Sequence, residues 1–279
     1  MGETTQAQHD LARRFAALHH GARPLLLPNA WDAGSAAIFA ALGYPAIATT
    51  SGGVAWSLGH ADGEVLALAE LLAAVRRMVR VVNVPVTVDF EAGFGATPQQ
   101  VGESVRALLD TGAVGLNLED GVEHAWLRPV GDAAARIAAA RAAAASAGVD
   151  VFINARVDNW IVGRMDAAAL FEEAVQRARA YIDAGADGIY PIALSDPELI
   201  ERFCRAVPAP INVGARAGSS SLEALKQLGV ARVSTATRLA MVAYSAARET
   251  AQALRATGEF AGLDASFGYD ALQRLFPKH

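Results

Sequence analysis

The chain has 279 residues, of which 53% are hydrophobic and 19% are charged, and its formal net charge is −5. This apolar content can build a large core and argues against an intrinsically disordered chain. The acidic balance provides no broad basic field, so we expect neither nucleic acid nor an anionic membrane as a partner.

Short β-rich runs alternate along the chain with longer helical patterns rich in Ala and Leu. The eight predicted strands are 24–27, 46–49, 84–89, 115–119, 151–155, 188–191, 211–213 and 232–234. Most of them are continuous apolar runs, which is typical of parallel strands covered on both faces. Eight β/α units favour a closed TIM-type (β/α)8 barrel over the rival open, doubly wound sheet.

Capping residues mark the predicted helix boundaries. Thr97-Pro98 and Asp196-Pro197 each place proline after an N-cap residue, and residues 220–223 fit a capping box. Helix ends are predicted at Gly43, Gly112, Gly148, Gly185 and Gly229. We expect one domain over 1–279, with the barrel at about 22–246 and a helical tail at about 247–279. One extra helix precedes the first strand.

Acidic residues follow the second, third and fourth predicted strands. Asp89 and Glu91 end the third, Glu119 ends the fourth, and Asp62 follows the second. The active site of such a barrel lies at the C-terminal ends of its strands, where these carboxylates would repel each other and take up protons or a cation. Oxygen-rich sets suit Mg²⁺ or Mn²⁺. We predict Asp89 as the direct ligand and Glu91 and Glu119 as holders of metal-bound water.

Other residues at the strand ends suit a bound anion. Arg156, after the fifth strand, offers a positive fork for a substrate carboxylate. Ser51 to Gly53, after Thr50 on the second strand, can bring hydroxyl and backbone N–H groups to an oxyanion. Asn212 on the seventh strand is a further candidate. The predicted substrate-binding residues are Thr50, Ser51, Gly52, Gly53, Arg156 and Asn212.

At these positions the sequence resembles the isocitrate lyase/phosphoenolpyruvate mutase superfamily, over about residues 10–244. Residues 88–95 match the family pattern V-D-x-D/E-x-G-x-G, and 50–62 match its Ser/Gly-rich stretch with a following Leu-Gly-x-x-Asp. Residues 118–120 correspond to I-E-D and 155–158 to A-R-x-D.

This resemblance implies a Mg²⁺ site from Asp89, Glu91 and Glu119, with Asp62 as an outer contact. It also implies that Ser51, Gly52 and Arg156 hold a 2-oxo acid or its enolate. The chemistry of the family forms or breaks a C–C or P–C bond beside a carbonyl.

The chain departs from the superfamily after the fourth strand. Residues 121–129 are shorter than the Cys-bearing loop of the lyases and lack the Asn-bearing loop of the mutases. Ile192 stands where the family often has Glu or His. The local candidates for proton transfer are His124 and Glu123. Together with the strand-end residues, the predicted catalytic residues are Arg156, Glu119 and His124.

Each candidate also has a purely structural interpretation. Arg156 could pair with Asp158, and 51–53 could be a tight turn. Asp62 could cap a helix starting near residue 63, and Asn212 could cap the next turn. His124 could be a loop residue without a role. Trp31 and Tyr190 are interpreted as packing residues, and Cys204 as a core residue.

The expected reaction is C–C cleavage of the 2-methylisocitrate lyase type, on a small 2-oxo or 2-hydroxy di- or tricarboxylate through a metal-stabilised enolate. The alternatives within the superfamily are oxaloacetate hydrolysis or decarboxylation, and phosphoenolpyruvate mutase or phosphonopyruvate hydrolase chemistry. A hypothesis of another class is a 2-oxo acid-binding protein with little turnover. The last alternative is an ordinary barrel whose carboxylates only support the scaffold.

The remaining expectations concern location and assembly. The single cysteine excludes an internal disulfide, the first twenty residues show no signal peptide, and no stretch approaches the roughly 18 apolar residues of a membrane span. We therefore expect a cytoplasmic protein. The tail contains Phe260, Phe267, Tyr269, Leu272, Leu275 and Phe276. This apolar surface predicts packing against a neighbouring subunit in a homodimer or homotetramer, and the family exchanges a C-terminal helix in this way.

Overall fold

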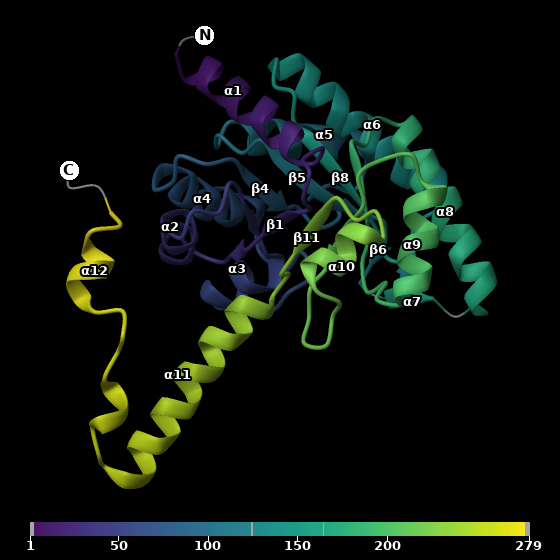
Figure 1. The fold of residues 1–279 in the computed structure, drawn as a ribbon. Coiled ribbons are helices and arrows are strands. Elements are labelled where there is room, and N and C mark those ends of the chain that lie inside the picture. Colours follow the sequence, from purple (N-terminus) through teal and green to yellow (C-terminus); the bar gives the residue numbers. More distant parts are fainter. Residues whose placement is uncertain (1–2, 124, 164, 277–279) are drawn as a thin grey trace.

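A computed structural model describes residues 3–123, 125–163 and 165–276. Helices and strands alternate along them (Figure 1). The strands are β1 (Leu25–Leu27), β2 (Asn29–Ala30), β3 (Ile47–Thr49), β4 (Val86–Asp89), β5 (Gly115–Glu119), β6 (Gly121–Val122), β7 (Trp126–Leu127), β8 (Phe152–Val157), β9 (Gly188–Pro191), β10 (Asn212–Gly214) and β11 (Arg232–Ser234). The helices are α1 (Glu3–Leu18), α2 (Ala33–Ala41), α3 (Ser51–Ser57), α4 (Leu68–Arg80), α5 (Pro98–Leu109), α6 (Val130–Ala147), α7 (Asn159–Val162), α8 (Ala167–Asp183), α9 (Pro197–Ala206), α10 (Leu222–Gln227), α11 (Arg238–Thr257) and α12 (Tyr269–Gln273), with a 3₁₀ turn, η1, at Ala261–Leu263.

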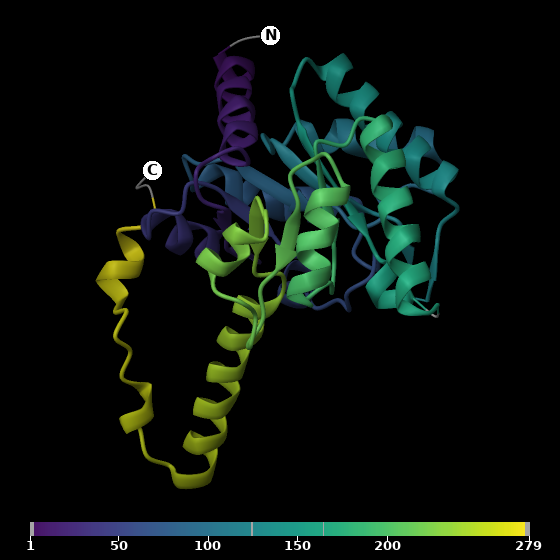
Figure 2. The ribbon, with the colours of Figure 1, turned by 45° about the vertical axis from the view of Figure 1, so that its right-hand side comes forward.

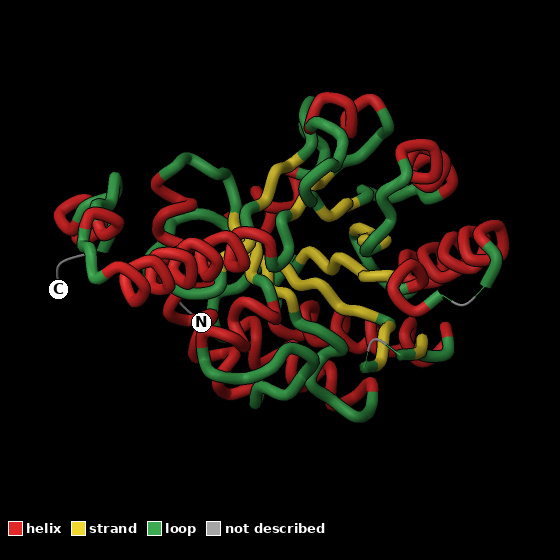
Figure 3. Tube along the Cα trace, turned by 90° about the horizontal axis from the view of Figure 1, so that it is seen from below, coloured by secondary structure: helices red, strands yellow, loops and turns green. Residues whose placement is uncertain are grey.

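The parallel strands form a ring. One sheet has the order β2-β3-β4-β5-β8-β9 and another has the order β1-β11-β10. They join on one side because only Pro28 separates β1 from β2, and on the other because Ile189 of β9 bridges Ile211. Figure 3 shows the strands in the middle of the molecule with helices outside them. The predicted (β/α)8 barrel is confirmed, and the open sheet is wrong.

Several predicted boundaries move by one or two residues. The first predicted strand, 24–27, is β1, and the chain continues beyond Pro28, which has no N–H to donate to a neighbour, as the short strand β2, which was not predicted. The fifth runs on through Val157, so Arg156 lies inside β8 rather than after it. Thr97 and Asp196 are N-caps as predicted. The capping box at 220–223 is wrong, because Ser221 is the N-cap of α10 and its hydroxyl accepts from the N–H of Ala224.

The ends of α1 and β5 fit together at the N-terminal end of the barrel. A Cβ on Gly115, the first residue of β5, would lie 2.7 Å from the ring of Phe15, so only glycine leaves room for that ring. His19 stacks on Phe152 with ring centroids 3.8 Å apart. Its Nδ1 lies 2.9 Å from the carbonyl oxygen of Phe15. Helix α1 therefore closes this end with aromatic side chains.

Burial of His19 makes the protein sensitive to acid. Burial, and then the positive charge of Arg232, lowers the pKa of His19 from 6.5 to about 3. The unfolded chain binds this proton between pH 6.5 and 3 and the folded chain does not, so stability falls as pH drops through that window. We expect His19→Gln to remove about 2 kcal/mol of the loss between pH 7 and 5. Urea unfolding at both pH values checks this, with the exposed neighbour variant His20→Gln as control; equal losses in all three proteins would contradict it.

The C-terminal elements leave the barrel. Helix α11 extends away from the strands, and the chain returns through η1 to α12 (Figures 1 and 2). The sequence pattern predicts the end of the barrel at about residue 246, but this position lies inside the continuous helix α11. Phe260 and Tyr269 are 72% and 76% exposed, so the tail covers little of its own apolar surface. In the described ranges, no helix has both the length and the apolar character needed to cross a membrane.

Candidate active site

Asp89 ends β4 at the C-terminal edge of the barrel. Its backbone N–H donates to the hydroxyl of Thr49 at 2.9 Å, and its Oδ2 accepts from the backbone N–H of Ser51 at 3.1 Å. Its Oδ1 is buried and finds no hydrogen-bond partner among the described residues. A buried carboxylate oxygen without a donor favours a cationic ligand, because leaving such an atom unsatisfied is costly.

Glu91 lies two residues beyond, in a turn with φ of +47°. Its carboxylate accepts from the backbone N–H of Glu64, and the carboxylate of Glu64 accepts from the N–H of Phe94. Burial first, and then repulsion from Asp89, raises the pKa of Glu91 to about 8. Asp62 and Glu64 add to that repulsion. The predicted carboxylates therefore converge closely enough to oppose one another's ionisation.

Glu119 and Asp158 flank Arg156 at the ends of β5 and β8. Nη1 of Arg156 lies 2.6 Å from Oε2 of Glu119. Its Nε and Nη2 donate to the two oxygens of Asp158, each at 2.8 Å. Burial raises the pKa of Glu119 well above its usual range, although Arg156 opposes this. The structural interpretation of Arg156 is confirmed, because its guanidinium pairs with Asp158. Its role toward a substrate carboxylate stays a prediction.

A buried network behind Arg156 fixes that pair. The carboxylate of Asp120 accepts from the backbone N–H of Asp158 at 2.9 Å and from the hydroxyl of Tyr181 at 2.6 Å. Arg177 of α8 donates to the same carboxylate at 3.2 Å and to the carbonyl of Arg128 at 2.9 Å. The network thus connects β8, α8 and the end of the loop that follows Glu119.

The second predicted strand supplies the other wall of the site. Gly52 and Gly53 lie in the first turn of α3, so the interpretation of 51–53 as an isolated tight turn is wrong. A Cβ on Gly52 would lie 2.9 Å from Oδ2 of Asp62, so glycine lets that carboxylate approach. Asp62 does not cap α4, whose N-cap is Ala67. Thr50 is buried and is the N-cap of α3, without a side-chain capping bond.

Polar residues fill the barrel beneath the carboxylates. Asn212 lies in β10 and its Oδ1 accepts from the hydroxyl of Ser234 at 3.1 Å, so it caps no turn. Arg232 is buried, and burial lowers its pKa to about 10. Tyr190 is buried as predicted, and burial raises the pKa of its hydroxyl, while the positive charge of Arg156 opposes this and the charge of Asp89 adds to it. It therefore packs directly below the site.

A cavity of about 230 Å³ opens beside the carboxylates. Its lining residues are Gly63, Glu64, Glu91, Ala92, Glu119, Gly121, Val122, Glu123 and Arg128. Of these described residues, Arg128 is the one cationic side chain. The predicted catalytic residue His124 lies outside the described residues, while its neighbour Glu123 lines the cavity. Glu64 and Arg128 were not predicted as site residues. For Glu64, the sequence gives no sign of its φ of +57°.

The residues present fit a hard divalent cation. The donors at the strand ends are all oxygens, which such ions prefer. In the described part of the chain, no three His, Cys, Asp or Glu side chains form a ready set of direct ligands. Mg²⁺ usually keeps several waters and uses one or two carboxylates directly. Asp89, with its free buried oxygen, suits direct contact, and Glu91, Glu119 and Asp62 suit the surrounding shell.

The raised pKa of Glu91 gives a test in metal-free protein. The folded chain keeps a proton on Glu91 up to about pH 8, while the unfolded chain loses it near 4.5. Stability therefore falls as pH rises through that window, by about 3 kcal/mol at pH 7. In EDTA we expect Glu91→Gln to be more stable than the parent at pH 7–8 and no more stable at pH 4.5, with the exposed Glu103→Gln as control. Added Mg²⁺ should stabilise the parent more than the variant, which thermal unfolding would measure.

The barrel and its strand-end residues define an α/β-barrel enzyme that gathers carboxylates and an arginine at one mouth. A family model described as phosphoenolpyruvate phosphomutase matches residues 15–255. The chain therefore belongs to the isocitrate lyase/phosphoenolpyruvate mutase superfamily of lyases and mutases, as the resemblance implied.

Individual relatives match most of the chain. An uncharacterized protein of Mycobacterium tuberculosis (strain CDC 1551 / Oshkosh) is 38% identical over 93% of this chain and 94% of its own length. The 2-methylisocitrate lyase of Escherichia coli K12 is 32% identical over 73% of this chain and 69% of its own. A solved structure from Burkholderia cenocepacia J2315, provisionally assigned as a phosphonomutase, is 40% identical with a TM-score of 0.83, over 90% of this chain and 100% of that one.

Proposed function

We propose that the chain is a divalent metal-dependent carbon–carbon lyase. Its substrate is a small 2-hydroxy or 2-oxo di- or tricarboxylate of the 2-methylisocitrate type, cleaved through an enolate. The observation that carries the proposal is the orphaned, buried Oδ1 of Asp89 among Glu91, Glu119 and Arg156. Mg²⁺ or Mn²⁺ held there would stabilise negative charge on the enolate oxygen.

The side chains of this protein then divide the work. Arg156 keeps one guanidinium edge on Asp158 and turns Nη1 to the mouth, where a substrate carboxylate would compete with Glu119 for it. Ser51, Gly52 and Gly53 bring the first turn of α3 against the same region, with Thr50 and Asn212 in the wall beneath. Glu123 and His124, in the shortened loop, are our candidates for proton transfer.

Two other functions remain candidates. The absence of the Cys-bearing loop from residues 121–129 favours a 2-oxo acid-binding protein with little turnover. The same loop leaves oxaloacetate hydrolysis or decarboxylation open, because these reactions also produce or protonate an enolate. Phosphoenolpyruvate mutase or phosphonopyruvate hydrolase chemistry would require a loop that this chain lacks.

The test is product release from a panel of acids. Purified protein with Mg²⁺ is incubated with 2-methylisocitrate, isocitrate, 2,3-dimethylmalate, oxaloacetate and phosphonopyruvate, and pyruvate, glyoxylate and oxalate are measured. We expect pyruvate or glyoxylate from a hydroxy acid, lost on adding EDTA. Oxalate from oxaloacetate would favour the hydrolase. A Mg²⁺-dependent rise in melting temperature with oxalate but no product would favour the binding protein.

We also propose a homodimer or homotetramer in which the tail after residue 246 packs against a neighbouring copy. Among the described tail residues, Phe260, Leu263, Phe267, Tyr269 and Leu272 are exposed. Large apolar side chains that gather in an exposed segment often mark a protein–protein interface. Light scattering that gives the mass of one chain would contradict this proposal.

A further inference from the structure

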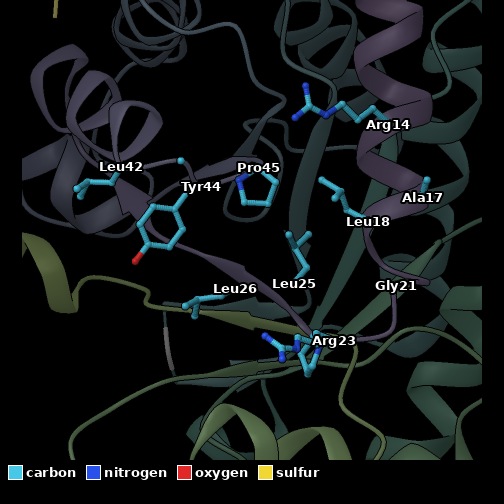
Figure 4. A pocket seen from close by; sticks show the side chains of 12 residues that line it. Arg14, Ala17, Leu18, Gly21, Arg23, Leu25, Leu26, Leu42, Tyr44 and Pro45 are labelled. Atoms are coloured by element: carbon cyan, nitrogen blue, oxygen red, sulfur yellow. The ribbon is translucent and has the colours of Figure 1, made fainter.

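A second cavity lies at the opposite end of the barrel from the carboxylates. It has a volume of about 730 Å³, is open to solvent, and lies between the end of α1, the beginning of β1 and the turn between α2 and β3. Figure 4 shows its wall of apolar side chains, with Leu18 and Leu25 on one side and Tyr44 and Pro45 on the other. Because β1 enters the barrel at Leu25, the cavity lies at the N-terminal ends of the strands, away from Asp89 at the end of β4.

Two arginines give this apolar cavity a positive character. In Figure 4, Arg14 extends from α1 along one rim and Arg23 extends beside Leu26 along another. No acidic residue is among the described lining residues. Within the described ranges, neither arginine lies within 4 Å of a carboxylate. Arg13, one residue away on α1, instead pairs with Asp10 and is not part of the lining.

The lining selects the kind of ligand that would bind. Its volume is in the range of small-molecule sites, roughly 300–1,000 Å³. The apolar wall would penalise a small di- or tricarboxylate, because it offers few partners for several polar groups. A guanidinium at the rim suits one carboxylate, and Leu42, 69% exposed, extends the apolar rim. Charge and apolarity together therefore fit one acidic group on an apolar body.

We propose that this cavity binds an amphipathic carboxylate, with the acidic group held by Arg14 or Arg23 and an apolar chain lying on Leu18, Leu25 and Pro45. The site is separate from the carboxylate mouth of the barrel, so the proposal does not depend on the proposed lyase function. A ligand here would contact both α1 and the start of β1, the elements that close the N-terminal end of the barrel.

The test uses dodecanoate below its micelle-forming concentration as the probe, measured by isothermal titration calorimetry on the full chain. We expect saturable binding of one dodecanoate per chain. The double variant Arg14→Gln/Arg23→Gln should weaken it at least about ten-fold, while Arg13→Gln and Asp89→Asn should bind as the parent does. Dodecanol, which lacks the charge, should bind at least about ten-fold more weakly than dodecanoate.

Each other outcome would overturn the proposal. No binding to the parent protein would do so, and so would equal binding by the double variant with a parent-like melting temperature. Displacement of dodecanoate by Mg²⁺ with oxalate would assign the binding to the carboxylate mouth instead. Dissociation of an oligomer by dodecanoate in sedimentation would mean that a second copy covers this cavity. If the double variant fails to fold, Leu42→Gln supplies the same comparison from the exposed apolar rim of the cavity.

Discussion

An Asp89→Asn protein is expected to lose about a hundred- to a thousand-fold in kcat/KM and to lose its thermal response to Mg²⁺. The substitution keeps the shape of the side chain and the acceptor for the Ser51 N–H, but it removes the charge from the buried oxygen that has no donor among the described residues. The measurements are steady-state kinetics on the best substrate of the panel and melting temperature against Mg²⁺ concentration.

The control for Asp89→Asn is Asp110→Asn. Asp110 is the exposed C-cap of α5 and pairs with Arg106, before β5 begins at Gly115 and so away from the C-terminal ends of the strands. It should leave both readouts unchanged. A protein that carries Asp89→Asn and still turns over substrate with the metal response of the parent would refute the metal site and the proposed lyase together.

The sequence predicts the positions of the carboxylates well because strand ends determine them. Asp89 and Glu119 each end a continuous apolar run, and parallel strands bring such ends to one edge of a barrel. The same rule predicts that Gly52 and Asp62 lie at the same edge of the barrel. It does not predict their close approach, because the loop that carries Asp62 has no periodic sequence pattern. The barrel itself was predictable from eight repeated strand and helix patterns.

The partners of these residues were harder to predict. Glu64 reaches Glu91 because it adopts a positive φ, which a sequence does not reveal for a residue other than glycine. Arg177 and Tyr181 lie on α8, more than fifty residues beyond Asp120. In the sequence these two residues occupy ordinary helix positions, and only the tertiary structure brings Asp120 into contact with them. The local sequence pattern therefore predicts that Glu91 and Asp120 lie at strand ends, but it does not predict which residues contact them.

Asp120→Ala is expected to destabilise the protein by about 3–5 kcal/mol. Removing this buried acid leaves the guanidinium of Arg177 and the hydroxyl of Tyr181 without it, and the N–H of Asp158 without its acceptor. Asp120→Asn keeps an acceptor in place and should cost less. Urea unfolding at pH 7 measures both. The exposed pair of Glu201 with Arg205 provides the control, since Glu201→Ala should cost under about 1 kcal/mol.

The two variants at Asp120 also separate stability from the geometry of the site. Asp120 holds the backbone of Asp158, and Asp158 holds Arg156, so a shift at Asp120 should reach the guanidinium that faces the mouth. If Arg156 binds the substrate carboxylate, Asp120→Asn should raise KM more than it lowers kcat in a protein that is still folded. Unchanged kinetics in such a protein, or a loss of stability no larger than that of Glu201→Ala, would mean that Arg156 keeps its position without this network.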